Sequence, residues 1–288
     1  MRVSSKTRVC GLMGDPVEHS LSPAIQNAAF EALGLDYVYV AFTVKQKDLG
    51  NAILGVRGLG FRGLNVTMPH KIEVIQYLDK LDDTAKEIGS VNTIVNEGGN
   101  LIGYTTDGIG ALNALRYKEV DPSSKKIVVL GAGGSSRSVS FTLAEKAEEL
   151  VILNRTFERA KKLVDDLSGL LGDSARIRAG RLSDGTLKKE LEDADIVVNA
   201  TSVGMNPKST ETPVDRDLLH HGIVVFDLVY EPLETRLLRE ARREGAETVD
   251  GLAMLVHQAA ASFEIWTGEK APIEVMMKAA TDKLEKNG

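Results

Sequence analysis

The chain has 288 residues, a length that suggests about two domains. Hydrophobic residues make up 43% and charged residues 26%, which is typical of a globular protein with sizeable cores. The formal net charge of −6 disfavours nucleic acid as the main partner. The single cysteine, Cys10, excludes an internal disulfide, and its apolar surroundings predict a buried thiol.

Localisation signals are weak in this sequence. No stretch approaches the ~20 apolar residues needed to span a bilayer, so no membrane partner is expected. The first residues, Met1 to Arg8, are followed by only a short apolar run without the small residues of a cleavage site. We therefore expect no signal peptide and a cytoplasmic protein.

The first third of the chain alternates between strand and helix signals. Ser22 is expected to cap a helix, with Pro23 at its first position. The Glu97-Gly98-Gly99-Asn100 turn predicts a hairpin, because Gly-Asn pairs supply the positive φ angles of tight turns. The predicted strands are 8–13, 37–42, 61–66, 92–95 and 101–104, and the predicted helices are 22–33, 45–57, 70–78 and 82–88. This alternation with a hairpin predicts a mixed sheet.

The rest of the chain predicts a second α/β domain and a helical tail. A helix over 108–117 leads through a Pro/Ser-rich loop into the next unit. Strands are expected at 127–130 and 150–153, then at 196–199 as the third and 223–227 as the fourth, with helices at 136–147 and 235–244. The segments 252–267 and 273–286 have helical spacing. This tail would cap the second domain or return to the first.

A glycine-rich turn follows the first strand of the second domain. In the segment Gly131 to Ser135, the glycines would let the backbone approach a dinucleotide pyrophosphate, and the helix that follows offers free N–H groups. The third glycine of the strict G-x-G-x-x-G pattern is replaced by Ser136, so the match is partial. Placement between two buried strands favours a nucleotide site over a turn without a ligand.

The end of the next strand indicates which dinucleotide is bound. An acidic residue there would bind the ribose 2′-hydroxyl of NAD, whereas this chain has Asn154, Arg155 and Thr156. A guanidinium suits a 2′-phosphate, which predicts NADP. The alternative is that Arg155 is only a solvated charge at a strand end.

Four polar clusters lie outside this turn. Ser20 and Ser22 are two residues apart and can offer two hydroxyls to one carboxylate, although Ser22 alone is equally explained as a helix cap. Asn65 and Thr67 lie at a strand's carboxyl end, where ligands of open α/β sheets bind, and Lys71 follows in the next predicted helix. The other two clusters surround Asn92 and Asp107; Asp107 alone would be equally explained as a cap.

Taken together, these motifs resemble the shikimate dehydrogenase family. The resemblance runs nearly end to end, through S-L-S-P, N-V-T-x-P-x-K, V-N-T, T-D-G-x-G, G-A-G-G and N-R-T to the late Gly251 and Gln258. It implies an α/β protein with a mixed-sheet substrate domain (residues 1–106 and 250–288), a Rossmann-type doubly wound NADP domain (107–249), and an active-site cleft between them. The implied reaction is the reversible, NADP-dependent reduction of 3-dehydroshikimate to shikimate.

The resemblance also implies a role for each matching residue. Lys71 and Asp107 would be the catalytic pair. Substrate contacts would come from Ser20, Ser22, Asn65, Thr67, Asn92, Tyr230 and Gln258. Cofactor contacts would come from Gly131, Ala132, Gly133, Gly134, Ser135, Asn154, Arg155, Thr156 and Gly251. The chain departs from the family pattern at Thr105, which replaces an asparagine, and at Ser90, which replaces an alanine.

The residue types fit ketone reduction. A charged lysine can donate a proton to the developing alkoxide or stabilise it, and an aspartate can orient the ammonium group. The five histidines are scattered, so no metal is predicted. Two alternatives remain: a quinate/shikimate dehydrogenase with broader substrate or NAD use, and a non-catalytic NADP-sensing regulatory protein. The partner is expected to be the small-molecule substrate, and the protein a monomer or homodimer.

Overall fold

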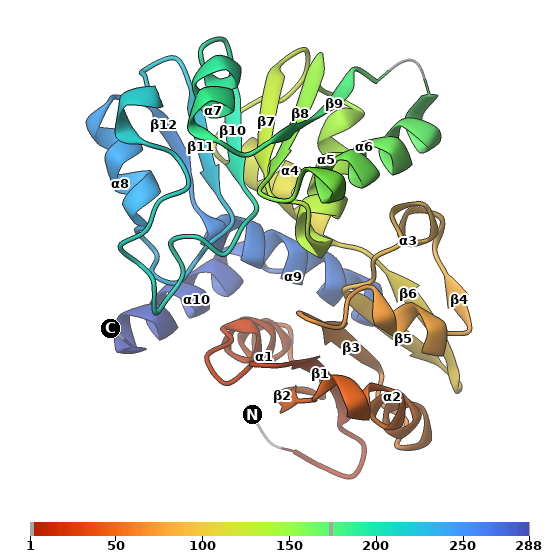
Figure 1. Ribbon diagram of the computed structural model, residues 1–288. Helices are drawn as coiled ribbons and strands as arrows, with labels where there is room; N and C mark the ends of the chain where they lie inside the picture. Colours follow the sequence, from red (N-terminus) through yellow and green to blue (C-terminus); the bar gives the residue numbers. More distant parts are fainter. Residues whose placement is uncertain (1–2, 173–174, 288) are drawn as a thin grey trace. The chain divides into compact units, whose positions relative to one another are not determined.

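A computed structural model of the chain describes residues 3–172 and 175–287 (Figure 1). The chain forms two compact units. Unit 1 consists of Met1–Asp107 and Val256–Gly288, and unit 2 is the continuous segment Gly108–Leu255. Each contains a six-stranded sheet of its own. The α/β class with a mixed sheet in the first unit and a parallel sheet in the second is confirmed.

The sheet of unit 1 has the strand order β2-β1-β3-β5-β6-β4. Parallel pairing joins β1 to β2 and β3, whereas β5 is antiparallel to both β3 and β6. The strands are β1 (Arg8–Gly14), β2 (Tyr37–Thr43), β3 (Gly63–Val66), β4 (Lys80–Leu81), β5 (Thr93–Glu97) and β6 (Asn100–Tyr104). Gly98 and Gly99 both have positive φ and form the two-residue turn of the predicted β5–β6 hairpin.

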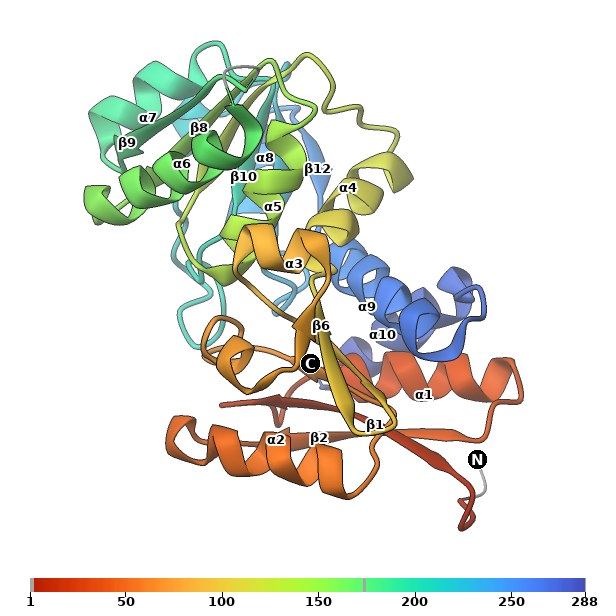
Figure 2. The same cartoon turned by 90° about the vertical axis from the view of Figure 1, so that its right-hand side faces the viewer.

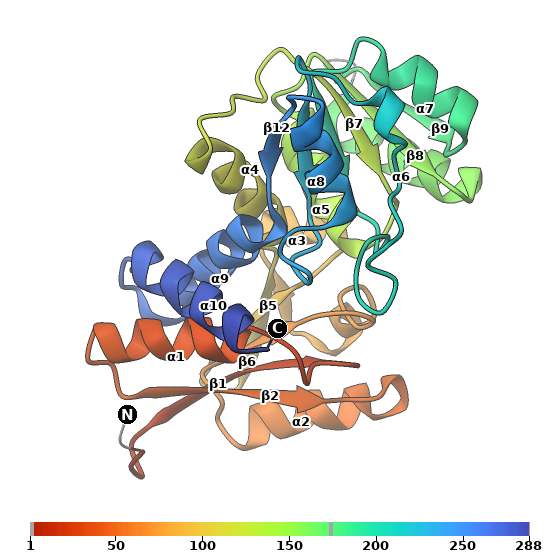
Figure 3. The ribbon, with the colours of Figure 1, turned by 90° about the vertical axis from the view of Figure 1, so that its left-hand side faces the viewer.

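Helices cover both faces of this sheet, α2 on one side and α1 with α10 on the other (Figures 2 and 3). The helices are α1 (Ser22–Ala32), α2 (Leu49–Gly58), α3 (Asp83–Ile88), α10 (Ile273–Asn287) and the later part of α9 (Gly251–Thr267). Trp266 of α9 lies against Gly63, where a side chain would clash with the indole ring. The glycine at this point of β3 therefore lets α9 pack directly on the sheet.

Two expectations for unit 1 are wrong. The N-cap of α1 is Leu21, and Ser22 already belongs to the helix. The helix expected over 70–78 is instead a turn followed by the short 3₁₀ helix η2 (Glu73–Tyr77). The carbonyl of Lys71 accepts a hydrogen bond from the backbone N–H of Val91 at 2.8 Å. Because this carbonyl is bonded across to another segment, it does not continue a helical ladder.

Unit 2 contains an all-parallel sheet with the order β12-β11-β10-β7-β8-β9. Numbered within the unit, this is the 3-2-1-4-5-6 order of the doubly wound dinucleotide-binding fold. The strands are β7 (Lys126–Leu130), β8 (Glu149–Asn154), β9 (Ile177–Arg181), β10 (Ile196–Asn199), β11 (Val224–Asp227) and β12 (Glu247–Val249). The helices are α4 (Asp107–Tyr117), α5 (Gly134–Ala144), α6 (Phe157–Leu171), α7 (Asp184–Leu191) and α8 (Arg236–Arg243).

The core of unit 2 follows from the alternation of side chains along its strands. Val128 and Leu130 of β7 pack in one cluster with Leu187 of α7 and Leu238 of α8. The intervening Val129 points to the opposite face, because neighbouring side chains of a strand alternate. Both faces of the sheet are thus buried, which explains the continuous apolar runs in β7 and β8.

The two edge strands of unit 2, β9 and β12, were not predicted from the sequence. β9 contains Arg178, Gly180 and Arg181 and is only partly buried, so it lacks an apolar run. β12 has three residues. Because β9 precedes β10, the strands expected as third and fourth are the fourth and fifth.

Cys10 is fully buried as a free thiol, as expected. Burial raises the pKa of this thiol to about 12, so it stays protonated. Within the described residues, no helix is both long and apolar enough to cross a membrane.

Candidate active site

Lys71 and Asp107 form a close ion pair within unit 1. The Lys71 ammonium nitrogen lies 2.5 Å from Oδ2 of Asp107. Lys71 comes from the turn before η2, and Asp107 is the first residue of α4. Their side chains are 14% and 5% exposed, so the pair is largely shielded from water while the ammonium keeps some access. A charge-assisted hydrogen bond in such a setting holds both groups firmly.

Asn92 fixes the other oxygen of the carboxylate. Its Nδ2 donates to Asp107 Oδ1 at 2.7 Å and lies 3.2 Å from Oε1 of Gln258. Its Oδ1 accepts from the backbone N–H of Thr106 at 2.8 Å, which orients the amide. Four of the residues singled out from the sequence therefore meet at one point, with Asn92 between the Asp107 carboxylate and α9.

The amide of Asn65 is already used within the protein. Its Nδ2 lies within 3.1 Å of three acceptors, and its Oδ1 accepts from the Tyr39 hydroxyl at 2.7 Å. Asn65 is 5% exposed. The half-buried Thr67 lies just beyond β3, where its N–H donates to the Met13 carbonyl at 2.9 Å. Asn65 is thus held in place by neighbours on β2, β5 and α9.

Ser20 and Ser22 have different environments from those expected. The Ser20 hydroxyl accepts the backbone N–H of Ser22 at 3.2 Å, so Ser20 satisfies a free donor in the first turn of α1. Ser22 is itself buried, and its side chain opposes the rise that burial causes in the pKa of Tyr39. The capping role expected for Ser22 therefore belongs in part to Ser20, and the hydroxyl of Ser22 is available to the polar interior of unit 1.

Several members of this polar cluster were not singled out from the sequence. Tyr39, Thr93, Thr106 and Ser262 are all buried and bonded to Asn65 or Asn92. Thr93 and Thr106 are the threonines of the V-N-T and T-D-G motifs themselves, so the sequence did contain a signal for both. Tyr39 and Ser262 lie in apolar stretches that read as core, so only the fold reveals their polar contacts.

The glycine-rich turn of unit 2 has the geometry expected of a phosphate-binding loop. Gly131 has φ = +111°, a conformation that favours glycine. Gly133 is the N-cap of α5, and the helix begins at Gly134, so Ala132 and Ser135 flank its free N–H groups. Ser136, in place of a third glycine, is buried and donates to the Gly131 carbonyl at 2.7 Å. This hydroxyl bond ties the helix to the turn.

The segment directly after β8 is exposed to solvent. Arg155 and Thr156 are exposed, and Asn154 Nδ2 donates to the Thr156 carbonyl at 2.9 Å. The side chain of Asn154 thus shapes the turn that leads into α6. The Arg155 guanidinium lies at the carboxyl end of β8, next in the sheet to the strand that precedes the glycine-rich turn.

Tyr230 and Gly251 lie beyond the carboxyl ends of β11 and β12. Burial raises the pKa of Tyr230. Three residues before it in the chain, Asp227 has a buried carboxylate. Asp227 accepts hydrogen bonds from Asn199, Val229 and Thr235, and burial raises its pKa to about 6. A side chain at Gly251 would meet the carbonyl oxygens of Leu228 and Val229 at 2.6 Å. Gly251 therefore lets the start of α9 pack against this loop.

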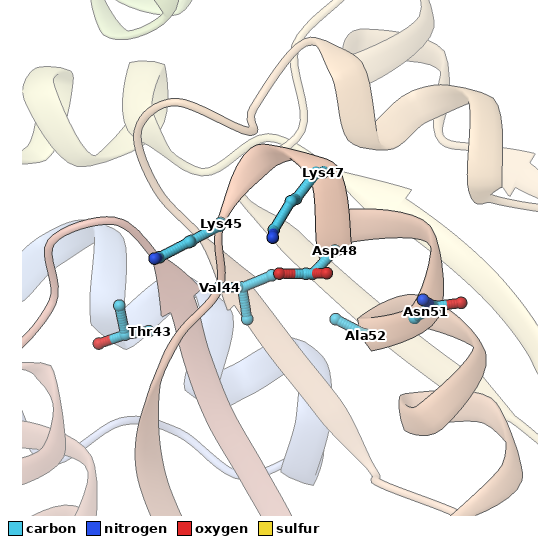
Figure 4. A pocket seen from close by; sticks show the side chains of 7 residues that line it. All are labelled: Thr43, Val44, Lys45, Lys47, Asp48, Asn51 and Ala52. Carbon is cyan, nitrogen blue, oxygen red and sulfur yellow. The ribbon is translucent and has the colours of Figure 1, made fainter.

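A surface hollow lies in unit 1 at the end of β2 and the start of α2 (Figure 4). It is lined by Thr43, Val44, Lys45, Lys47, Asp48, Asn51 and Ala52. None of these residues belongs to the polar cluster. Among residues 3–172 and 175–287, no three His, Cys, Asp or Glu side chains are placed to share a metal ion.

A doubly wound sheet with a glycine-rich first turn, together with a unit that holds a shielded lysine–carboxylate pair, defines the class of dinucleotide-dependent oxidoreductases. Profiles of protein families match the chain in three places. Residues 12–94 match the shikimate dehydrogenase substrate binding domain, 114–228 match shikimate/quinate 5-dehydrogenase, and 251–281 match the shikimate 5′-dehydrogenase C-terminal domain. The chain belongs to the shikimate dehydrogenase family.

Individual relatives cover nearly the whole chain. The shikimate dehydrogenase (NADP(+)) of Methanopyrus kandleri is 50% identical over 285 residues, covering 98% of each chain. A crystal structure of a shikimate dehydrogenase in complex with NADP+ is 45% identical, with a TM-score of 0.92 and 98% of each chain covered. The Thermus thermophilus enzyme in complex with NADP(H) and shikimate is 36% identical, with a TM-score of 0.87, covering 96% of this chain and all of that one.

Proposed function

We propose that this protein is an NADP-dependent shikimate dehydrogenase that reversibly reduces 3-dehydroshikimate to shikimate, a step of aromatic amino-acid (chorismate) biosynthesis. Family membership supports the reaction, and the observation that carries it in this chain is the Lys71–Asp107 pair at 2.5 Å. A protein that only sensed NADP would have no use for a shielded proton donor with an oriented carboxylate.

The residues of unit 1 would act on the substrate. Lys71 donates a proton to the ketone oxygen during reduction, or takes it back during oxidation, and Asp107 holds the ammonium in place. Asn92 fixes Asp107 through its other carboxylate oxygen. The remaining substrate contacts in this proposal are Ser20, Ser22, Asn65, Thr67, Gln258 and, from unit 2, Tyr230.

The residues of unit 2 fit a phosphorylated dinucleotide. The positive φ of Gly131 and the open space beside Gly133 let a pyrophosphate approach the N-terminus of α5. Exposed Arg155 suits a 2′-phosphate. The proposed cofactor contacts are Gly131, Ala132, Gly133, Gly134, Ser135, Asn154, Arg155, Thr156 and Gly251. When bound, NADPH supplies the hydride.

We also propose a division into domains, a cellular location and an oligomeric state for the protein. Residues 1–106 and 250–288 would form the substrate domain, and 107–249 the NADP domain. The protein would act in the cytoplasm as a monomer or homodimer. The domain assignment is supported by the positions of the family matches and by the division of the chain into two units.

One assay tests the function. Shikimate and NADP are mixed with the enzyme, and reduced nicotinamide is followed by its absorbance; the assay is repeated with NAD and with quinate. Turnover of shikimate with NADP at a kcat/KM well above that of the other three combinations is expected. Comparable turnover of quinate would indicate the broader quinate/shikimate activity, and binding of NADP without turnover would indicate a sensor.

A further inference from the structure

Two buried polar side chains lie next to each other at the carboxyl ends of neighbouring strands in unit 2. Asn199 ends β10 and Asp227 ends β11, and the two residues are directly paired in the parallel register. Both are fully buried. Nδ2 of Asn199 donates to Oδ1 of Asp227 at 2.9 Å. Neither the motifs nor the comparisons assign a role to Asn199.

Asn199 holds the loop that follows β10. Its Oδ1 accepts from the backbone N–H of Thr201 at 3.1 Å and from the Thr201 hydroxyl at 2.6 Å. Its Nδ2 also donates to the Val203 carbonyl at 3.2 Å. The Thr201 hydroxyl in turn accepts from the backbone N–H of Val203 at 3.1 Å. The amide of Asn199 and the hydroxyl of Thr201 therefore set the shape of the loop 200–203 together.

Asp227 anchors the Asn199 amide from the neighbouring strand. Its carboxylate only accepts, so the end of the amide that faces it is Nδ2, and Oδ1 of Asn199 faces the loop. The carboxylate is itself fixed, because Oδ1 accepts from the backbone N–H of Val229 at 3.0 Å and Oδ2 accepts from the Thr235 hydroxyl at 2.6 Å. Asn199 is thus held in one orientation by a group that does not belong to the loop.

The loop 200–203 adjoins the glycine-rich turn. β10 pairs with β7, and the N–H of Ala200 donates to the Leu130 carbonyl at 2.9 Å. A side chain at Gly131 would lie 2.9 Å from the carbonyl oxygen of Ala200 and 3.2 Å from Cγ2 of Thr201. The strand order reverses between β7 and β10, and doubly wound sheets bind a dinucleotide across that point.

The two sides of this reversal would bind different halves of NADP. In the proposed function, Arg155 after β8 binds the 2′-phosphate of the adenosine half, and the N-terminus of α5 binds the pyrophosphate. The nicotinamide half then lies on the other side of the reversal, at the loop after β10. We propose that Asn199 is a positioning residue that shapes the loop 200–203 for this nicotinamide half. This inference rests on the proposed function.

The experiment compares the binding of two ligands by calorimetry: NADP, and adenosine 2′,5′-bisphosphate, which has only the adenosine half. Thr201→Val removes the hydroxyl between Asn199 and Val203 and keeps the side-chain volume at a half-buried site. It should raise the Kd of NADP by about 3- to 10-fold, the range for one lost hydrogen bond, and that of the bisphosphate by less than about 2-fold. Asn199→Ala should show the same difference between the ligands.

Turnover gives a second measurement. In both variants, kcat for shikimate oxidation should fall by about 10-fold or more, because hydride transfer requires close alignment of the reacting atoms. The KM of shikimate should change by less than about 2-fold, because the substrate contacts Ser20, Ser22 and Asn65 of the proposed function lie in unit 1.

Two further variants serve as controls. Thr201→Ser keeps the hydroxyl and should bind both ligands within about 2-fold of wild type. Thr248→Val changes a half-buried threonine of β12, whose hydroxyl accepts from Arg242 at 3.1 Å outside this network. It should leave the binding of both ligands unchanged.

Three results would overturn the role of Asn199: an equal loss of affinity for the two ligands in Thr201→Val, no loss for NADP in that variant, or a Thr201→Ser enzyme as impaired as Thr201→Val. Because Thr201 is only half-buried, its variants decide the question even where Asn199→Ala does not fold. Wild type that binds NADP without oxidising shikimate would refute the proposed function, and the comparison of the two ligands would still decide the role of Asn199. Wild type that binds neither ligand would refute both.

Discussion

Individual side chains in unit 1 are oriented by buried polar neighbours. Asn92 illustrates this, because backbone and side-chain donors fix its Oδ1 while its Nδ2 reaches Asp107. A carboxylate held in this way keeps the Lys71 ammonium in one place without needing to reorganise during reaction. The position of the proton donor is thus a property of the folded unit before any substrate arrives.

Replacing Lys71 by alanine should reduce kcat by about 10²–10⁴-fold, the usual contribution of a general acid–base group. Binding of NADP, measured by fluorescence titration, should remain near wild type because Lys71 belongs to unit 1. Lys45→Ala, at an exposed lysine on the rim of the surface hollow, is the control and should retain full activity. A Lys71→Ala enzyme with half the wild-type kcat would remove this residue from the mechanism.

Arg155 offers a test of cofactor choice. Its alanine variant should weaken NADP binding by about 1.5–3 kcal/mol, the worth of a charge-assisted hydrogen bond, and leave NAD almost unaffected. The quantity to compare is kcat/KM for each cofactor. Arg243→Ala, at an exposed arginine at the end of α8, is the control. An equal loss of kcat/KM with both cofactors would mean that Arg155 supports the fold and does not bind the 2′-phosphate.

At the scale of elements, the sequence predicted those parts that carry a strong local signal. Glycines with positive φ marked the hairpin turn and the turn before α5, and continuous apolar runs marked β7 and β8. Two failures have different causes: a neighbouring residue decides one, and a distant segment decides the other. Ser22 was expected to cap α1, but Ser20 provides the hydroxyl that accepts a free N–H there. The segment after Pro69 was expected to be helical, but its carbonyl at Lys71 pairs with Val91.

The turn before α5 allows a matched pair of substitutions. Gly131→Ala should destabilise unit 2 by about 1–3 kcal/mol, because φ is +111° and the new methyl would lie 2.9 Å from the Ala200 carbonyl oxygen. Gly133→Ala, with extended backbone and open space around it, should change stability far less. Urea unfolding measures both. Equal losses in the two variants would show that the backbone at Gly131 is not strained by a side chain.

At the scale of the whole molecule, the sequence predicted two α/β units and a helical tail that could pack on either of them. It also located Lys71, Asp107, Asn92 and Gln258, which meet in unit 1. It could not reveal the hydrogen-bond partners of Tyr39 or Ser262, because these link segments far apart in the chain. Apolar periodicity predicts that a residue is buried, but it does not predict which buried polar group will be the hydrogen-bond partner of that residue.

The buried carboxylate of Asp227 should make global stability depend on pH. Its folded pKa of about 6 lies above the ordinary 3.8, so the folded state retains the proton longer than the unfolded chain. The stabilisation is complete below about pH 4 and is lost as pH rises through about 6, by on the order of 1–3 kcal/mol. Asp227→Asn cannot ionise, so its free energy of unfolding relative to wild type should increase over this range.

Urea unfolding at several pH values measures this difference. Asp217→Asn, at an exposed aspartate of the same unit, is the control for the loss of one carboxylate at the surface. A constant difference between Asp227→Asn and wild type would show that the buried carboxyl has an ordinary titration.

The discontinuity of unit 1 has a consequence for synthesis on the ribosome. Unit 2 is one continuous segment, so all of its strands emerge from the ribosome before the chain beyond Leu255 does. Unit 1 begins first but must wait for Trp266, which fills the space beside Gly63, and for Gln258, which joins Asn92. The nascent chain therefore passes through a stage in which the later-made unit is complete and the earlier one still exposes an unfilled core.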